Sequence, residues 1–198
     1  MTESMNTGNQ EKIEPIAPNC PLSLRQRIEL PDRTAHLIFW PVLLAGLLLD
    51  LWSKHAVFAW LWNEGDRGAA IIKGFLSFQL ALNEGAAFGI AEGARPFLIG
   101  VSVLAMLIIF GVFFFGAAKQ RVIQMALGLF GAGVCGNLWD RIFNDGRVRD
   151  FIDVVYWPGR HWHTFNVADA WLCIAVGLLI VATFITDPSD RRRDPPQK

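Results

Sequence analysis

The sequence predicts an all-α membrane protein whose four helices cross the bilayer. The first observation is the composition: 53% of the 198 residues are hydrophobic and only 18% are charged, whereas a soluble domain carries about 25% charged residues. The second is the position of the apolar residues, which fall into four long runs separated by polar segments. A membrane-spanning helix requires roughly 20 predominantly apolar residues, so these runs are the candidate spans.

The first candidate helix begins near His36 and is the least regular of the four. Residues 36–49 carry no formal charge, Asp50 interrupts them, and the apolar character then continues to about Trp60. This segment spans the membrane only if Asp50 lies inside the helix or near its end. Lys54 follows Asp50 by four residues, which places both charges on one helical face. The simplest interpretation is a structural ion pair.

The next two candidate helices occupy residues 96–118 and 122–139, joined by the short basic link "KQR". The first of them reaches about 34 Å as a helix. The second ends in "GNLWDR", in which Asn137, Asp140 and Arg141 share one helical face. We expect this face to point inward as a packing and orienting network, in which Arg141 can hold a carboxylate through two parallel hydrogen bonds.

The fourth candidate helix, residues 170–186, starts directly after Asp169, with Asn166 three residues earlier. A carboxylate in a first helical turn is stabilised by the helix dipole, so Asp169 has an ordinary explanation as a capping residue. Ionisable groups at membrane depth are nevertheless rare and usually functional. Asp169 is therefore also a candidate for chemistry at the membrane boundary.

Two longer loops, about residues 61–95 and 141–165, connect these helices on the side opposite the link "KQR". In the first loop, residues 75–82 predict a strand and Asn83-Glu84-Gly85 a turn. The small residues Gly85, Ala86 and Ala87 would let a substrate backbone approach, although a simple hairpin turn explains them equally well. In the second loop, residues 147–157 predict a strand at the membrane interface, and Trp157 and Trp162 fit the aromatic belt.

The Lys and Arg residues near the helix ends predict the orientation. The segment before the first helix, the link "KQR" and the C-terminal tail all carry them, so these segments are expected on the cytoplasmic side and both loops outside. Arg141, Arg147, Arg149 and Arg160 in the second loop run against this rule. We therefore expect a flexible cytoplasmic leader (1–35), a membrane domain (36–187) and a cytoplasmic tail (188–198), with no removable signal peptide.

Two aspartates could together catalyse peptide hydrolysis. Asp150 lies in the second predicted strand and Asp169 at the start of the fourth helix, so both could meet at one membrane depth. Two carboxylates a few ångströms apart cannot easily both ionise, and one keeps its proton. The ionised one would take a proton from water and the protonated one would donate to a scissile carbonyl. Asp153 competes with Asp150 for this role, and a cation at Arg149 would favour the charged form of Asp150.

Other classes of function remain open at this point. A proton-coupled transporter or channel would also use intramembrane Asp, Arg and Asn side chains, but here the acids cluster at one side instead of crossing the bilayer. A non-enzymatic membrane scaffold leaves the two acids unexplained. The formal net charge of zero gives no indication of nucleic-acid binding. The three cysteines, Cys20, Cys135 and Cys173, have neither disulfide-framework nor zinc-site spacing.

Five motifs in order resemble those of the lipoprotein signal peptidases, the type II signal peptidases of the membrane aspartyl protease class. They are "DLWSK", "NEGAAF", "GNLWDR", "GRVRDF" and "FNVAD", and the resemblance covers about residues 40–186. It implies four transmembrane helices with a small extracytoplasmic β-structured platform, formed largely by the first outer loop. The sequence differs from the usual family pattern at three places. Its leader is longer, Ala170 stands where Ser is frequent, and Arg149 stands where an apolar residue is common.

The resemblance also implies residue roles, an activity and partners. The implied roles are catalytic for Asp150 and Asp169, supporting or substrate-binding for Asn83, Gly85, Asn137, Arg141 and Asn166, and structural for Asp50, Lys54 and Asp140. The implied activity is cleavage of diacylglyceryl-modified prolipoproteins before the lipidated cysteine, on the outer side of the bacterial inner membrane. No metal and no cofactor is expected. The expected partners are prolipoproteins and membrane lipids, without nucleic acid, and the expected state is a monomer.

Overall fold

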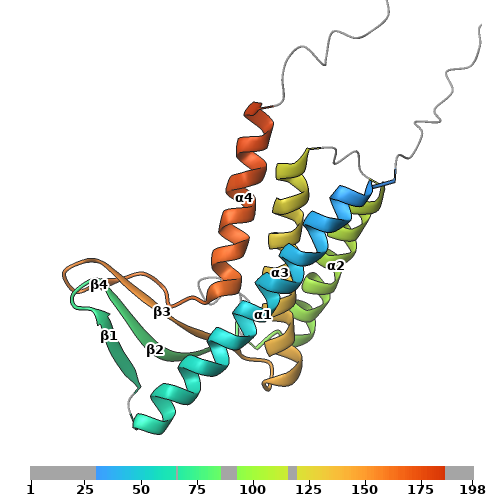
Figure 1. Ribbon diagram of the computed structural model, residues 1–198. Helices are drawn as coiled ribbons and strands as arrows, with labels where there is room; N and C mark the ends of the chain where they lie inside the picture. The colour runs from blue at the N-terminus through green and yellow to red at the C-terminus, as the bar shows by residue number, and fades with distance from the viewer. Residues whose placement is uncertain (1–29, 66, 86–92, 116–119, 186–198) are drawn as a thin grey trace, which may run out of the picture.

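The computed structural model describes residues 30–65, 67–85, 93–115 and 120–185 (Figure 1). Its elements in chain order are α1 (Arg33–Glu64), β1 (Gly68–Ile72), β2 (Leu76–Asn83), α2 (Arg95–Phe115), α3 (Arg121–Phe143), β3 (Val148–Trp157), β4 (Arg160–His161) and α4 (Val167–Ile185). All four helices are long and apolar enough to cross a membrane. The predicted four-helix membrane fold is therefore confirmed. The predictions for Ala86 and Ala87, for the tail and for most of the leader fall outside the described residues.

The third helix is the centre of the bundle, since α3 packs against α1, α2 and α4. The start of α1 and the end of α4 lie at the same end of the bundle, and the sheet lies beside the opposite end (Figure 1). Every connection that carries a strand is therefore on one side, as the two longer loops predicted.

The first helix is longer than a bilayer requires. Its 32 residues extend about 48 Å, whereas the hydrocarbon core is about 30 Å thick. Asp50 and Lys54 both lie inside this helix, which meets the condition that the sequence set for a first span. The last turns of α1 continue past the bundle, where Val57 and Leu61 pack against Phe151 of β3. In this way α1 supports the sheet as well as crossing the membrane.

The start of α1 is tied to the start of α3 by a charged pair that the sequence did not predict. The Asp32 side chain accepts a hydrogen bond from the Ala35 amide at 2.7 Å and so caps the helix. Arg121 pairs with the same carboxylate at 2.7 Å. The hydrogen bond from Arg121, followed by that from Ala35, lowers the pKa of Asp32 to about 2.

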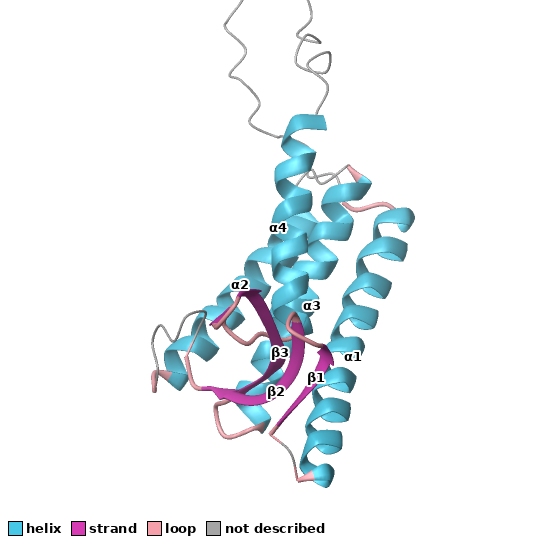
Figure 2. Cartoon of the chain, turned by 90° about the vertical axis from the view of Figure 1, so that its left-hand side faces the viewer, coloured by secondary structure: helices cyan, strands magenta, loops and turns pink. Residues whose placement is uncertain are grey.

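The four strands form one antiparallel sheet in the order β1-β2-β3-β4, which lies near the end of the bundle opposite the start of α1 (Figure 2). Both predicted strands are confirmed, with β2 displaced by one residue from the expected range. The register places Ala81 opposite Asp150 and Ser77 opposite Asp153. Two of the four strands come from the second outer loop. The strands β1 and β2 of the first loop have 5 and 8 residues, and β3 and β4 of the second have 10 and 2. The first loop thus supplies about half of the platform, somewhat less than the resemblance implied.

Glycines in α3 let its neighbours approach closely. A Cβ at Gly133 would lie 2.6 Å from the Ala168 carbonyl oxygen, and one at Gly136 would collide with the Asp50 carboxylate. Small residues at such crossings are typical of packed membrane helices. Here they bring the start of α4 and the buried charge of α1 against the same turn of α3.

We expect Gly136→Ala to destabilise the protein, because the added methyl group has no space beside Asp50. Overpacking of this kind costs about 1–3 kcal/mol. Thermal unfolding in detergent measures the effect. Gly111→Ala in α2 is the matched control, since no atom lies within 4 Å of a Cβ at Gly111. Equal melting temperatures for the two variants would contradict the prediction.

Candidate active site

The start of α4 is closed by a reciprocal pair of hydrogen bonds between Asn166 and Asp169. The Asp169 amide donates to Asn166 Oδ1 at 3.0 Å, and the Asn166 amide donates to Asp169 Oδ2 at 3.2 Å. This arrangement is a capping box, which satisfies backbone donors at a helix start. The ordinary explanation of Asp169 as a capping residue is therefore correct, but it uses only one of the two carboxylate oxygens.

Asp150 of β3 is held by two side-chain amides. Asn166 Nδ2 donates to its Oδ1 at 2.6 Å, and Asn83 Nδ2, from the end of β2, donates to its Oδ2 at 3.0 Å. Asp150 is only 3% exposed, whereas Asp169 is half-buried. The β2–β3 register thus brings Asn83 to Asp150 across 67 residues of sequence.

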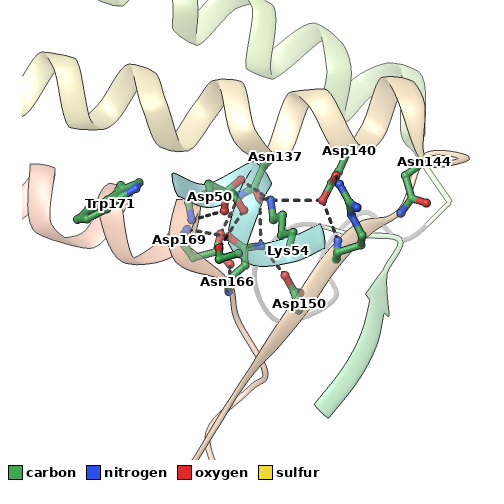
Figure 3. A network of polar contacts seen from close by, with 12 residues as sticks. Asp50, Lys54, Asn137, Asp140, Asn144, Asp150, Asn166, Asp169 and Trp171 are labelled. Carbon is green, nitrogen blue, oxygen red and sulfur yellow. Dashed lines mark hydrogen bonds and ion pairs between the residues drawn. The ribbon is translucent and has the colours of Figure 1, made fainter. Parts of the chain in front are cut away.

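Asn137 of α3 completes a bridge between the two acids (Figure 3). Its Nδ2 donates to Asp169 Oδ1 at 2.8 Å, and its Oδ1 accepts from Asn166 Nδ2 at 3.1 Å. Asn166 therefore contacts both acids, Asp150 through its side chain and Asp169 through its backbone. Strand β3, helix α3 and helix α4 converge at this point. The structure brings together all four predicted residues Asn137, Asp150, Asn166 and Asp169.

The pKa of the Asp150 carboxyl is raised to about 6. Burial is the largest cause, because it penalises the charged form, and the negative charge of Asp169 adds to it. The hydrogen bonds from Asn83 and Asn166 and the charge of Lys54 act in the opposite direction. Strongly shifted acids with a charged partner are typical of reactive sites. The geometry therefore favours Asp150 as the acid that keeps its proton.

Lys54 is the centre of a second, fully buried set of charges beside the two acids. Its Nζ lies 2.8 Å from Asp50 and 3.3 Å from Asp140, and none of these side chains is exposed. The predicted ion pair between Asp50 and Lys54 is confirmed. Lys54 Nζ also donates to Asn137 Oδ1 at 3.2 Å, and Asp50 accepts from the Ala168 amide at 2.8 Å. These charges thus hold the residues that position Asp169.

The prediction for the partners of Arg141 is wrong. Within the described residues its guanidinium donates to two carbonyl oxygens, that of Gly85 at 2.9 Å and that of Asn137 at 3.4 Å, and to no carboxylate. Its Nε is buried and has no hydrogen-bond partner in the part of the chain that the structure describes. Gly85 is held from its other side as well, because its amide donates to Asn83 Oδ1 at 2.9 Å. Arg141 and Asn83 thus fix the turn after β2.

Asp140, the neighbour of Arg141 on α3, is bound by a different arginine, Arg149 of β3. Nε and one terminal nitrogen of Arg149 donate to Asp140 Oδ1 at 3.1 and 2.6 Å, and its amide donates to Oδ2 at 3.0 Å. Side chains alternate along a strand, so Arg149 points away from Asp150. The expectation that Arg149 favours the charged form of Asp150 is therefore wrong, and the pKa of Asp150 is raised instead.

Asp153 does not compete with Asp150. The odd spacing of three residues along β3 places the two side chains on opposite faces of the sheet. Asp153 accepts hydrogen bonds from Ser77 at 2.7 Å and Gln79 at 2.8 Å, and its carboxylate lies 2.8 Å from His161 Nδ1. These contacts join β2, β3 and β4 beside an open cavity of about 440 Å³. Asp153 thus belongs to a separate cluster.

Comparison with known proteins agrees with the motifs and the geometry. The family model Peptidase_A8, described as Signal peptidase (SPase) II, matches residues 42–185. This range contains every member of both polar networks. The chain belongs to the signal peptidase II family. The resemblance that the five motifs indicated is therefore confirmed.

Relatives within the signal peptidase II family extend the match over most of the chain. A lipoprotein signal peptidase of Rhodopirellula baltica is 33% identical over 194 residues, covering 89% of this chain and 85% of the relative. One of Geobacter metallireducens is 37% identical over 145 residues, covering 72% and 87%. Two solved bacterial membrane enzymes have similar folds, with TM-scores of 0.63 and 0.62 at 26% and 28% identity. They cover 83% and 78% of this chain, and 93% and 94% of their own chains.

Proposed function

We propose that this protein hydrolyses diacylglyceryl-modified prolipoproteins immediately before the lipidated cysteine, using Asp150 and Asp169 as its catalytic pair. The coarser activity, removal of signal peptides from prolipoproteins, follows from membership of the family. The observation that carries the finer proposal is the convergence of two carboxylates, from β3 and α4, on the single residue Asn166. The two acids also differ in burial, as a division of labour requires.

In this mechanism the more exposed carboxylate activates water and the buried one acts as an acid. Asp169 takes a proton from water as the water oxygen attacks the carbonyl carbon of the scissile bond. Asp150, which holds its proton below pH about 6, donates to the carbonyl oxygen. The tetrahedral intermediate collapses when the nitrogen of the leaving cysteine receives the proton held by Asp169 and the C–N bond breaks. Asp150 then recovers its own proton from the new carboxyl group.

The supporting residues keep this pair in place. Asn137 and Asn166 orient the carboxylates, while Asn83 and Arg141 hold the turn at Gly85 close to Asp150. A substrate backbone that approaches this turn would meet a small residue next to the acids. We assign Asp50, Lys54 and Asp140 to the support of the bundle. All these residues come from one chain, so a monomer is sufficient for the reaction.

The position of the pair suits a substrate whose acyl chains lie in the bilayer. Each buried methylene group contributes about 0.8 kcal/mol to membrane attachment, which keeps the modified cysteine near headgroup depth. Asp169 stands in the first turn of a membrane-spanning helix, at that same boundary. Because the modified cysteine and the two acids lie at the same membrane depth, cleavage is directed to the bond before that cysteine.

We infer that the end of the bundle with the acids faces outward in the bacterial inner membrane. Arg33 and Arg121 begin α1 and α3 at the other end (Figure 1), and Lys and Arg favour the cytoplasmic side. This orientation makes residues 1–35 a cytoplasmic leader and residues 188–198 a cytoplasmic tail, around a peptidase domain at 36–187.

The test of the proposed function is cleavage by the purified protein in detergent. A prolipoprotein peptide carrying the diacylglyceryl group is expected to be cut before the modified cysteine, and the same peptide without the lipid to be cut far more slowly. Mass spectrometry of the products identifies the bond. A metal chelator should leave the rate unchanged. Cleavage elsewhere, or equal rates for both peptides, would contradict the proposal.

The pH dependence follows from the shifted carboxyl of Asp150. The acid form of Asp150 predominates below pH about 6 and is lost above it, so the singly protonated pair disappears as the pH rises. We expect kcat/KM to fall about tenfold per pH unit on the alkaline side, with an apparent pKa that belongs to the pair. Initial rates at limiting substrate measure this, with intrinsic fluorescence as the control for folding. A profile that stays flat well above neutrality would exclude Asp150 as the acid.

A further inference from the structure

A cavity beside the sheet is lined by polar and aromatic side chains that the proposed reaction does not use. Its volume is about 440 Å³, and its lining residues are Gln79, Asp153, His161, Trp162, His163 and Thr164. We call it the histidine cavity, because two of the four histidines of the chain line it. It shares no residue with the proposed catalytic site, so it is a separate feature of the molecule.

The two histidines lie on one extended segment. After β4 the chain continues beside β3, since the Trp162 amide donates to the Val154 carbonyl oxygen at 2.8 Å and a bridge to β3 follows at Phe165. Side chains two residues apart on an extended segment point to the same face. His161 and His163 are therefore on one face, which agrees with their common place in the lining of the cavity.

The ring of His161 is oriented by a buried carboxylate. Its Nδ1 lies 2.8 and 3.0 Å from the two oxygens of Asp153, whose side chain is 3% exposed. Ser77 and Gln79 also donate to this carboxylate, as expected for an ionised group that only accepts hydrogen bonds. Nδ1 of His161 is therefore the donor, and in the neutral ring this tautomer has its lone pair on Nε2.

This arrangement is typical of a histidine that binds a metal ion. Such a histidine almost always donates its other ring N–H to a carboxylate, a carbonyl group or water, which fixes the tautomer and the direction of the ring. His161 has this partner in Asp153. The link that Asp153 makes between the strands does not require a second histidine two residues further along the chain, whereas a metal site does.

We propose that His161, through Nε2, and His163 together bind a Cu²⁺ ion, with Asp153 as the carboxylate that orients His161. Within the described residues no three His, Cys, Asp or Glu side chains are grouped so that they could hold a metal ion. The protein therefore supplies two ligands, and water completes the coordination. Cu²⁺ has the highest affinity of the common divalent first-row ions and accepts a planar set of nitrogen and oxygen ligands, whereas structural Zn²⁺ sites use four protein ligands.

The ion would hold the chain directly before the start of α4. The hairpin of β3 and β4 extends away from the bundle, and the chain then returns to α4 (Figure 1). His163 precedes Asn166 by three residues, and Asn166 contacts both acids. Asp153 and Asp150 lie on opposite faces of the sheet, so the ion takes no part in the proposed reaction. Its removal by a chelator is therefore compatible with an unchanged cleavage rate.

The test is a Cu²⁺ titration of the full-length protein in detergent, without a polyhistidine tag, followed by electron paramagnetic resonance. We expect a bound ion whose spectrum shows two nitrogen ligands. His161→Gln and His163→Gln should each reduce this number to one and weaken binding. Asp153→Asn should keep both nitrogen ligands but bind about 10–100-fold more weakly, because the carboxylate that orients His161 is lost. Circular dichroism of each variant shows that it is folded.

His55→Gln is the matched control, because His55 is an exposed histidine of α1 that does not line the cavity. It should leave both the affinity and the number of nitrogen ligands unchanged. The proposal is overturned if His161→Gln or His163→Gln binds Cu²⁺ as the parent does, which would place the ion elsewhere on the chain. Parent affinity in Asp153→Asn would contradict the orienting role of that carboxylate. These measurements need no substrate, so their outcome is separate from that of the cleavage assay.

Discussion

Asp150→Asn and Asp169→Asn are each expected to abolish cleavage of the lipid-modified peptide while the protein remains folded. General acid and base groups contribute about 10²–10⁴-fold each to the rate. The kcat of either variant should therefore be lower than that of the parent by at least that factor. An asparagine at 150 has no acidic proton to give to the carbonyl oxygen. An asparagine at 169 has no carboxylate to take a proton from water. The measurement is the initial rate at saturating peptide, with peptide binding determined separately.

Asp153→Asn is the matched control for Asp150→Asn. Both aspartates are on β3 and both are buried, at 2% and 3% exposure, but Asp153 faces the opposite side of the sheet. We expect Asp153→Asn to keep kcat within a few-fold of the parent, with any cost appearing in thermal stability through its bonds to Ser77 and His161. Turnover by either Asn variant of the proposed pair at the parent rate would remove that residue from the mechanism. Loss of turnover in Asp153→Asn alone would reverse the assignment.

Local spacing in the sequence was sufficient for the parts of the site that lie on one element. Asp50 and Lys54 are four residues apart on one helix, and their ion pair follows from helix geometry. Asn166 and Asp169 are three apart at a helix start, and their capping box follows in the same way. The four membrane spans could also be predicted from the sequence, because the bilayer imposes a length and a composition on each helix.

Contacts between elements could not be read from spacing. Arg149 lies nine residues after Asp140, and only the turn from α3 into β3 brings its guanidinium back to that carboxylate. Asn83 reaches Asp150 through the β2–β3 register, which a single sequence does not specify. The strands β1 and β4 were missed for a related reason. β1 begins with Gly and Ala, which favour strands weakly, and β4 has only two residues, so pairing with β2 and β3 rather than propensity determines them.

Lys54→Met is expected to cause the largest loss of stability among the polar variants. The ammonium group is fully buried between Asp50 and Asp140, and removing one partner of a buried ion pair costs roughly 3–5 kcal/mol because a buried charge is left uncompensated. Asp140 keeps its bonds to Arg149. Most of the lost stability therefore comes from the Asp50 carboxylate, which is left without a cation. Thermal unfolding in detergent measures the loss, and Lys73→Met, at an exposed position of the β1–β2 turn, should leave the melting temperature unchanged.

The double variant Lys54→Met with Asp50→Asn separates two causes of lost stability. One is the unpaired charge that Asp50 keeps when Lys54 is removed, and the other is lost packing. An asparagine at 50 is neutral, and its side-chain oxygen can still accept from the Ala168 amide as Asp50 does. We therefore expect the double variant to be more stable than Lys54→Met alone and to regain turnover, since the start of α4 is again held. Lys54 also donates to Asn137, which binds Asp169. If Lys54→Met unfolds at the parent temperature yet has no activity, this second contact is its principal role, and Lys54 belongs to the positioning of the acids instead of to the support of the bundle.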